Sequence, residues 1–329
     1  MTGAERMDLQ DNEGGGRLAA VTGVTGFIGG HLAGELTRRG WRLRVLARSM
    51  PRFPALAGPP IEVVQGSLSD PSALRDLVEG ADAVLHLAGA IKGSNRNDFM
   101  AANAEGTAAL AEAWRAHAPE ARFLYLSSMV AREPGLSHYA ASKHAAEQRL
   151  RDIGAGAEWS ILRPAVVYGP GDRETLRIFR AASGPVQPML NSADARLTLI
   201  HVADLVRAMA AMLAAGLAPG CHEVTDARHD GYSWDELARA AAAALGRAAR
   251  PLQVPRSVIR ALGLAGDVAA LGGVAGMLTS QKVREILHRD WRSDPAGQPP
   301  ASRWRPEITL GQGFAEAVAW YRAAGWLRR

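Results

Sequence analysis

Short apolar runs alternate with amphipathic segments through the first half of the chain. The runs fall at residues 18–22, 43–47, 61–64, 83–87, 123–126 and 159–162. Helical periodicity separates them, at residues 32–39, 71–79, 104–117 and 139–151. Such alternation is typical of βαβ units, whose strands are parallel and covered by helices on both faces. The pattern therefore predicts an α/β fold built on a doubly wound parallel sheet of the Rossmann type.

The alternation of apolar runs and amphipathic segments ends after Gly169, where alanine-rich helices and loops rich in proline and glycine follow. This change predicts a smaller, mostly helical C-terminal domain that binds substrate. The length agrees, because 329 residues suit one large α/β unit or two domains that share a cleft. We assign residues 17–168 to the Rossmann domain, expect 197–216 to return to it, and give the substrate-binding domain 169–196 and 217–329.

Composition narrows the function classes. The chain is 47% hydrophobic and 22% charged, and its single cysteine, Cys221, excludes an internal disulfide framework and fits a reducing, cytoplasmic location. The net charge is +5, but the arginines are scattered with no basic run interleaved with aromatic residues. We therefore expect no nucleic-acid partner. We expect no metal either, because the histidines lack ligand spacing.

Two segments bear on targeting and membrane insertion. Residues 1–16 are polar and glycine-rich without an apolar core, which predicts a disordered leader rather than a signal peptide. Residues 258–278 form the longest apolar stretch, but Arg260 and Asp267 interrupt it. Each charge at the centre of a membrane helix costs about 2.5–3.5 kcal/mol. We expect no integral membrane span, and contact of this stretch with a membrane surface is the lesser alternative.

A glycine-rich loop, Thr22-Gly-Val-Thr-Gly-Phe-Ile-Gly29, joins the first expected strand to the first helix. Gly23 permits a tight turn, Gly26 lets the backbone approach a pyrophosphate, and Gly29 lets helix and strand pack closely. The helix N-terminus then presents free N–H groups to phosphate. The loop predicts a dinucleotide site. Its other candidate contacts are Thr25, Phe27 and Ile28.

The end of the second strand bears on the choice of nucleotide. An NAD site places Asp or Glu there to hold the ribose hydroxyls, whereas this chain has Ala47-Arg48-Ser49. The Arg48 guanidinium suits a 2′-phosphate. We therefore expect NADP, with NAD as the alternative if Arg48 is only solvated and the backbone holds the ribose.

Tyr139 and Lys143 stand four residues apart, which places both on one face of a helix. An ammonium beside a phenol favours the phenolate and lowers a phenol pKa of ~10 towards neutrality. A tyrosine tuned in this way can exchange a proton with a substrate oxygen. The pair alone is common in ordinary helices, where Tyr packs and Lys is solvated. The nucleotide loop upstream favours the catalytic interpretation here.

With these pieces in place, the chain resembles the extended short-chain dehydrogenase/reductase family, also called the NAD-dependent epimerase/dehydratase family. The resemblance spans residues 18–327 and rests on seven motifs in the family's order. They are the glycine loop, His86-Leu-Ala-Gly89, Asn103-Ala-Glu-Gly-Thr107, Leu126-Ser-Ser128, the Tyr139 and Lys143 pair, Arg163-Pro-Ala-Val-Val-Tyr-Gly-Pro170 and Ile200-His-Val-Ala-Asp204.

The resemblance implies roles for individual residues. Tyr139 would be the general acid/base, Lys143 would tune it and bind the nicotinamide ribose, and Ser128 would hydrogen-bond the substrate oxygen, with Ser127 a weaker candidate. For Asn103 two interpretations stay open, a residue of the site and a helix cap. His201 and Asp204 are expected to orient a helix rather than to act as acid and base. Further cofactor contacts are implied for Ser67, Leu68, Ala88, Gly89, Pro164, Val166 and Val167.

Several positions depart from the family's pattern. Ser67 stands where members often have an Asp that contacts adenine, which alters that contact. Met129 and Val130 follow Ser128, where dehydratases of the family carry an Asp-Glu pair that expels water. Ala165 replaces an Asn that binds the diphosphate in many sugar-nucleotide enzymes. Together with the short segment between Ser128 and Tyr139 and the apolar stretch 258–278, Ala165 predicts a small-molecule substrate more apolar than a nucleotide sugar.

Three functions compete at this point. The favoured one is an NADP(H)-dependent oxidoreductase that interconverts an alcohol and a ketone or aldehyde, with Tyr139 as acid/base. The second is a nucleotide-sugar epimerase with bound NAD, which the Ala165 and Arg48 positions disfavour. The third is a non-catalytic NADP-binding assembly or sensor protein, which the retained Tyr139 and Lys143 disfavour. A homodimer is possible.

Overall fold

Seven parallel strands form the central sheet, in the order β11-β6-β5-β4-β1-β2-β3. The structure is a computed structural model that describes residues 16–49, 61–215, 220–271 and 278–327. The expected leader therefore lies outside the described residues, except for its last position. The strands are β1 Leu18–Thr22, β2 Arg42–Ala47, β3 Glu62–Gln65, β4 Ala83–His86, β5 Arg122–Leu126, β6 Trp159–Pro164 and β11 Gly220–Val224.

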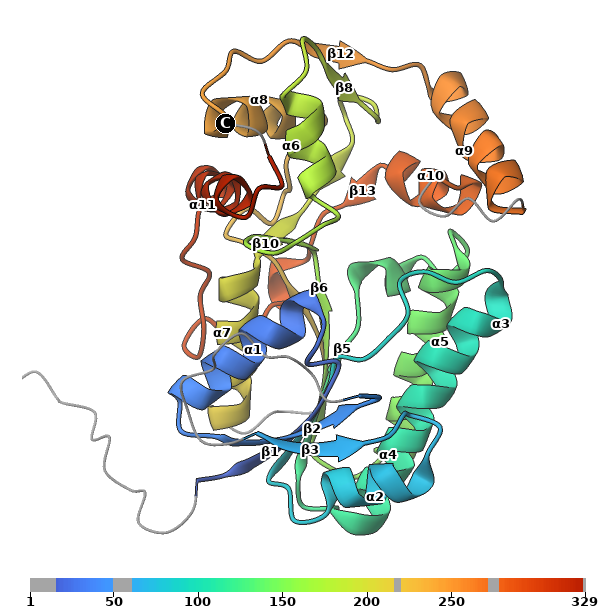
Figure 1. Cartoon of the computed structure of the whole chain (residues 1–329), viewed down its shortest axis with the longest axis vertical. Coiled ribbons are helices and arrows are strands. Elements are labelled where there is room, and N and C mark those ends of the chain that lie inside the picture. Colours follow the sequence, from blue (N-terminus) through green and yellow to red (C-terminus); the bar gives the residue numbers. More distant parts are fainter. Residues whose placement is uncertain (1–15, 50–60, 216–219, 272–277, 328–329) are drawn as a thin grey trace, which may run out of the picture.

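Helices cover both faces of this sheet (Figure 1). On one face lie α1 Phe27–Arg38 and α7 Val202–Ala215, and on the other lie α2 Pro71–Val78, α4 Gly106–His117 and α5 His138–Ile153. Strand β1 shows why its sequence is a continuous apolar run. Its Ala19 and Val21 join the core beneath α1 and α7, whereas Ala20 joins the core beneath α2, α4 and α5. A strand buried on both faces has no polar side to present. The predicted doubly wound parallel sheet is confirmed.

The C-terminal half builds a second, mostly helical layer with its own core. Helices α6 Leu176–Ala182, α8 Trp234–Ala244 and α11 Leu310–Ala323 pack around Phe179 and Phe314, whose ring centroids are 4.9 Å apart. Beside them lie α9 Arg256–Leu271 and α10 Ser280–Leu287. Three two-stranded sheets connect these helices: β7 Val166–Tyr168 with β10 Leu199–His201, β8 Gln187–Met189 with β12 Pro251–Gln253, and β9 Arg196–Leu197 with β13 Asp290–Trp291.

One strand enters the sheet from a region that the sequence assigned elsewhere. The segment 220–224, placed with the substrate-binding domain, forms β11 at the sheet edge beside β6. It arrives there because α7 packs on the sheet next to α1 and directs the chain back along it. Within the described ranges, no helix is long and apolar enough to cross a membrane.

The junction of β1 and α1 depends on close backbone contacts that only glycine allows. Gly23 has a φ of +77°, and a Cβ there would lie 2.6 Å from the Ala88 nitrogen. At Gly29 a Cβ would lie 2.7 Å from Val24 Cα and would overlap the Gly23 carbonyl oxygen. The neighbouring Gly30 is exposed, and its nearest atom would be 4.0 Å away.

We predict that Gly29→Ala and Gly30→Ala shift stability in opposite directions. Gly29→Ala is expected to cost about 1–3 kcal/mol, because the methyl group overpacks the backbone of the loop. Gly30→Ala, the matched control in the same helix, is expected to stabilise by roughly 0.5–1 kcal/mol through the lower entropy of the unfolded chain. Urea unfolding of both variants is the measurement. Equal midpoints would contradict the close approach at Gly29.

Candidate active site

The predicted cofactor residues gather at one edge of the sheet, because nearly all of them follow the carboxyl ends of parallel strands. The strand order reverses between β4 and β1, where such folds bind nucleotides. Pro164 itself ends β6. The loop from Gly23 to Gly29 follows β1, Arg48 follows β2, Ser67 and Leu68 follow β3, Ala88 and Gly89 follow β4, Ser128 follows β5, and Val166 and Val167 follow β6.

The start of α1 has the properties of a phosphate site. Gly26 is its N-cap residue, no side chain caps the helix, and no acidic residue stands in its first turn. Its N-terminal N–H groups and dipole are therefore available to an anion. Arg48 is exposed directly after β2, at the same sheet edge. These residues fit a dinucleotide, and the contacts themselves stay a prediction.

The other predicted contacts are more varied. The Ser67 hydroxyl bonds the Ser69 hydroxyl at 2.9 Å, so it is held by the chain itself. The Leu68 side chain packs over Gly106, where a Cβ would lie 2.8 Å from Leu68 Cδ1. Val166 is 37% exposed beside buried Pro164, which leaves an apolar surface at the end of β6.

Buried His86 fixes the loop after β4. Its Nδ1 lies 2.7 Å from the Thr22 hydroxyl and its Nε2 lies 3.0 Å from the Thr107 hydroxyl. Burial, aided by the charge of Lys143, lowers the pKa of His86 to about 3, so the ring is neutral. The Thr22 oxygen also accepts the Ala88 N–H at 3.2 Å. His86 thus joins β1, β4 and α4 as a structural residue.

Asn103 is a bridging residue rather than a helix cap. It lies inside a π-helical stretch, Met100–Glu105, and is buried. Its side chain accepts the Ala90 N–H at 2.8 Å, and its Nδ2 donates to the Ala90 carbonyl at 3.0 Å and to the Ser142 hydroxyl at 2.8 Å. Asn103 therefore fastens the loop after β4 to α5. This contact also requires Gly89, where a Cβ would lie 2.7 Å from Asn103 Oδ1.

The structure brings Ser128, Tyr139 and Lys143 together. Ser128 is the N-cap residue of a short 3-10 helix, Met129–Arg132, that follows β5. Tyr139 and Lys143 lie in the first two turns of α5, and the Ser128 hydroxyl is near enough to the Tyr139 phenol to lower its pKa. Their catalytic roles stay predictions, but the grouping they require is present.

The neighbouring Ser127 is engaged elsewhere. It is buried and donates to Glu147 Oε1 at 2.6 Å. Arg163 binds the same carboxylate, with Nε 2.8 Å from Oε1 and Nη2 2.5 Å from Oε2. Glu147 was not predicted, although it follows Lys143 by four residues on the same helix face. Ser128 is therefore the serine of the pair that faces Tyr139.

Lys143 lies in a place from which water is excluded. It is 4% exposed, its Nζ donates to the Leu126 carbonyl at 2.9 Å, and it lies 4.5 Å from the centre of the Tyr125 ring. Burial lowers the pKa of Lys143 to about 7, and the Glu147 carboxylate opposes this shift. The amine is therefore close to its titration point at neutral pH.

The pKa of Tyr139 is raised above its ordinary value, to about 12, so the predicted lowering by Lys143 is wrong. Burial is the main cause, and the nearby Glu285 carboxylate acts in the same direction, whereas the neighbouring Ser128 hydroxyl opposes both. Lys143 does not dominate because its ammonium is directed to the Leu126 carbonyl and is itself weakened by burial.

Glu285, on α10, is a site residue that sequence reasoning missed. Its carboxylate accepts the Ser137 hydroxyl at 2.5 Å and the Lys282 ammonium at 2.9 Å. Ser137 in turn caps α5 by accepting the Ala140 N–H. The His138 N–H donates to Gln281 of the same helix at 2.7 Å. The second layer thus holds the start of the catalytic helix, a long-range contact with no local sequence signal.

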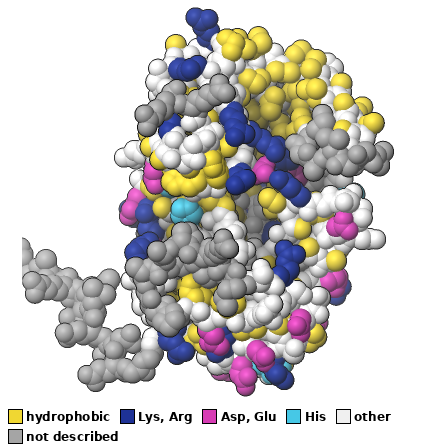
Figure 2. Space-filling model, in the orientation of Figure 1, with side chains coloured by type: hydrophobic (Ala, Val, Ile, Leu, Met, Phe, Trp, Pro, Cys, Tyr) yellow, Lys and Arg dark blue, Asp and Glu magenta, His cyan; other side chains and the backbone are white. Residues whose placement is uncertain are grey.

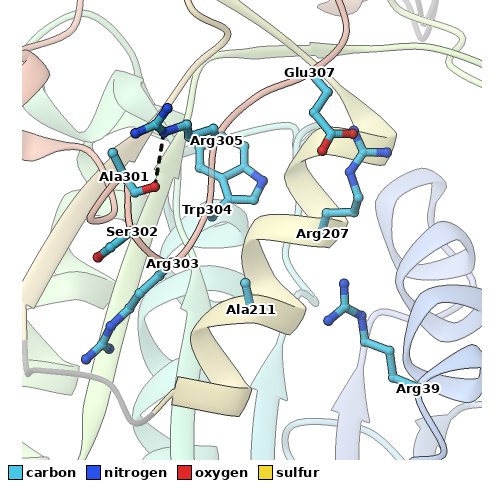
Figure 3. A pocket seen from close by; sticks show the side chains of 9 residues that line it. All are labelled: Arg39, Arg207, Ala211, Ala301, Ser302, Arg303, Trp304, Arg305 and Glu307. Carbon is cyan, nitrogen blue, oxygen red and sulfur yellow. Dashed lines mark hydrogen bonds and ion pairs between the residues drawn. The ribbon is translucent and has the colours of Figure 1, made fainter. Parts of the chain in front are cut away.

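A separate pocket of about 360 Å³ lies at the opposite end of α1 from the glycine loop (Figure 3). It is formed by the C-terminal end of α1, by α7 and by the segment 301–307, and its guanidinium groups come from Arg39, Arg207, Arg303 and Arg305. Asp204 anchors its wall by accepting the Glu307 N–H at 3.1 Å and the Ile308 N–H at 2.9 Å. Asp204 therefore ties α7 to the segment that leads into α11.

The family can now be assigned. Residues 19–224 match the sequence profile of the NAD dependent epimerase/dehydratase family. The chain belongs to this family. Its curated relatives include several reductases, and this epimerase/dehydratase protein is an NAD(P)-dependent enzyme of the extended short-chain dehydrogenase type.

Two curated relatives show the range of similarity. A ceramide reductase of Caulobacter vibrioides is 42% identical over 312 residues, which cover 94% of this chain and 96% of that protein. A 2-alkyl-3-oxoalkanoate reductase of Stenotrophomonas maltophilia is 33% identical over 180 residues, which cover 47% of this chain and 52% of the relative.

Solved structures support the fold. The UDP-glucose 4-epimerase of Thermus thermophilus, solved with NAD, aligns with a TM-score of 0.68 at 22% identity, covering 94% of this chain and 99% of its own. A human epimerase family protein, solved with NADPH, aligns with a TM-score of 0.69 at 20% identity, covering 92% of this chain and 99% of its own.

We predict that Glu285→Gln lowers the pKa of Tyr139. A nearby carboxylate disfavours the phenolate, so removing its charge makes deprotonation easier, while the amide oxygen can still accept the Ser137 hydroxyl. The test is a pH titration by NMR of protein labelled with ¹³C at tyrosine Cζ, with Tyr139→Phe to assign the signal. The Tyr139 signal should begin to move at lower pH in Glu285→Gln than in the wild type. Glu112→Gln, an exposed change on α4, is the control, and an unchanged titration in Glu285→Gln contradicts the proposal.

Proposed function

We propose that this enzyme is an NADP(H)-dependent reductase of a ketone in a long-chain lipid of the ceramide class. The observation that carries the proposal is the 42% identity to a ceramide reductase over 94% of this chain and 96% of that protein. Similarity at that level over the whole length includes the substrate-binding layer, not only the Rossmann domain. The grouping of Ser128, Tyr139 and Lys143 supplies the chemistry that such a reduction needs.

The cofactor, when bound, supplies a hydride to the carbonyl carbon. The Ser128 hydroxyl binds the carbonyl oxygen, and the Tyr139 phenol donates the proton that completes the alcohol. A phenol with its pKa raised to about 12 keeps its proton at neutral pH, which suits the acid role in reduction better than the base role in oxidation. Lys143, one turn further along the same face, favours the phenolate that this transfer leaves behind.

An apolar substrate agrees with the surface beside the predicted nicotinamide position. Ala165 is 7% exposed, and its N–H donates to the Val224 carbonyl at 3.0 Å, so this position offers no side-chain donor to a diphosphate. Val166, next to it, is 37% exposed. Unpaired phosphate charge is costly to desolvate in such surroundings. Cytoplasmic location and a homodimer remain predictions.

We predict NADPH-dependent reduction of a ceramide that has been oxidised to the ketone at one alcohol carbon. The substrate is presented in detergent micelles and the loss of NADPH absorbance is followed. Tyr139→Phe is expected to lower turnover by about 10²–10⁴-fold, the usual contribution of a general acid, while cofactor binding stays intact because the ring still packs. Interconversion of a UDP-hexose with no net oxidation or reduction of the cofactor would instead support the epimerase function. Binding of cofactor with no turnover of any carbonyl compound would favour the assembly or sensor function.

We predict that NADP(H) binds more tightly than NAD(H) and that Arg48→Ala narrows the difference by about 1.5–3 kcal/mol, the worth of a charge-assisted hydrogen bond. Arg42→Ala is the matched control, because Arg42 is exposed at the opposite end of the same strand. Calorimetric titration of both cofactors into the three proteins is the measurement. Equal affinities in the wild type would overturn the assignment of Arg48.

A further inference from the structure

Helix α9 packs inward through one large apolar residue and two glycines, whereas four further large apolar residues face outward. Its buried positions are Ile259, Gly263 and Gly266. A Cβ on Gly263 would lie 2.8 Å from Val283 Cγ2, and one on Gly266 would lie 2.8 Å from the carbonyl carbon of Leu278. The helix therefore sits so close to α10 and to the residues just before it that larger side chains cannot fit between them.

The four outward-facing side chains form what we call the apolar ridge. Figure 2 shows hydrophobic atoms gathered over the region where Figure 1 places α9, with Lys and Arg atoms along one border. A water-facing helix normally shows the reverse arrangement, with polar residues outside. The members of the ridge, all on α9, and their exposed fractions are Val258 46%, Leu262 51%, Leu264 62% and Val268 69%.

The ridge lies in a strongly cationic part of the chain. Residues 245–289 contain seven Lys or Arg residues against two carboxylates, Asp267 and Glu285. Two of the cations have carboxylate partners, because Lys282 lies 2.9 Å from Glu285 and Arg289 lies 3.5 Å from Asp194. In the part of the chain that the structure describes, Arg256, Arg260 and Arg284 form no ion pair, and Arg256 and Arg284 donate to carbonyl groups instead. The positive charge of these three arginines is therefore not neutralised by a direct carboxylate partner.

A groove connects the ridge with the catalytic helix. It has a volume of about 470 Å³ and runs between α9 and α10. At one side it reaches Leu136, which directly precedes the Ser137 cap of α5. Its apolar lining comes from Leu136, Leu264, Val283 and Leu287, and its cationic lining from Arg256, Arg260 and Arg284.

We propose that the apolar ridge and the arginines beside it dock on the surface of an anionic lipid bilayer. The leucine and valine side chains would enter the boundary between headgroups and acyl chains, while the guanidinium groups bind lipid phosphates. This arrangement uses both unusual properties of the surface, its exposed apolar residues and its uncompensated positive charge. Docking would also bring the groove, and with it the start of α5, to the membrane.

A second copy of the chain is a poorer occupant. The common two-fold dimer interface pairs one patch with the same patch on its partner, so the cationic border would face itself. Like charges brought together in this way oppose association. Anionic headgroups neutralise the same charges. The inference goes beyond the proposed reduction, and vesicle binding tests it without any turnover.

The test is co-sedimentation of the purified full chain with vesicles of phosphatidylcholine alone and of phosphatidylcholine mixed with phosphatidylglycerol. We expect binding to the anionic vesicles that weakens as salt rises. Arg260→Gln should lower the partition coefficient about fivefold. Leu262→Gln combined with Val268→Gln should lower it roughly tenfold or more. Arg75→Gln, an exposed arginine on α2, is the matched control and should bind as the wild type does.

Because the substituted side chains are exposed, thermal unfolding of these variants should match that of the wild type, which separates loss of binding from loss of fold. Three outcomes would overturn the proposal. They are absence of wild-type binding to anionic vesicles, wild-type binding by the double ridge variant, and a dimer in vesicle-free solution that the double ridge variant abolishes. The last outcome would assign the ridge to a second copy of the chain.

Discussion

The position of α5, the helix that carries Tyr139 and Lys143, depends on one buried carboxylate. Glu147 is fully buried, and a buried charge is costly unless its oxygens are hydrogen-bonded. Here Ser127 after β5 and Arg163 on β6 satisfy them. Arg151, four residues further along α5, also binds this carboxylate, at 3.2 Å. Loss of Arg163 would remove the two-point contact that ties the buried charge to β6, so α5 has one strongly preferred position against the sheet. Tyr139 and Lys143, on the same face of α5, take their places at the strand ends from this contact.

The N-terminal end of α5 is held by the second, mostly helical layer. Glu285 and Gln281 of α10 bind Ser137 and the His138 N–H, so the substrate-binding half fixes the turn that carries Tyr139. The same Glu285 charge helps to keep the phenol protonated. One contact therefore links domain packing to the protonation state of the proposed acid. A movement of α10 would alter both the position and the pKa of Tyr139.

The sequence predicted the features that depend on interactions between residues close together in the chain. Glycines at the first loop, apolar runs on both faces of the sheet and the spacing of Tyr139 and Lys143 are short-range features, and the structure contains the elements they predict. Prediction from the sequence failed where segments distant in the chain come into contact. The bridging role of Asn103 needs a loop and a helix that only the fold brings together. The direction of the Tyr139 pKa shift needs Glu285, and the entry of β11 into the sheet needs the return path through α7.

The burial of Lys143 lowers the stability of the folded protein at neutral pH. Its pKa falls from 10.5 to about 7 on burial, so between these values the unfolded chain binds more protons than the folded one. Stability contributed by this residue therefore rises as pH increases from about 7 towards 10.5, and at neutral pH the residue opposes folding. A neutral side chain would remove that opposition, but it would also remove the positive charge that favours the phenolate left by proton transfer. Burial lowers the pKa of Lys143 and raises the pKa of Tyr139, so the two shifts share one physical cause.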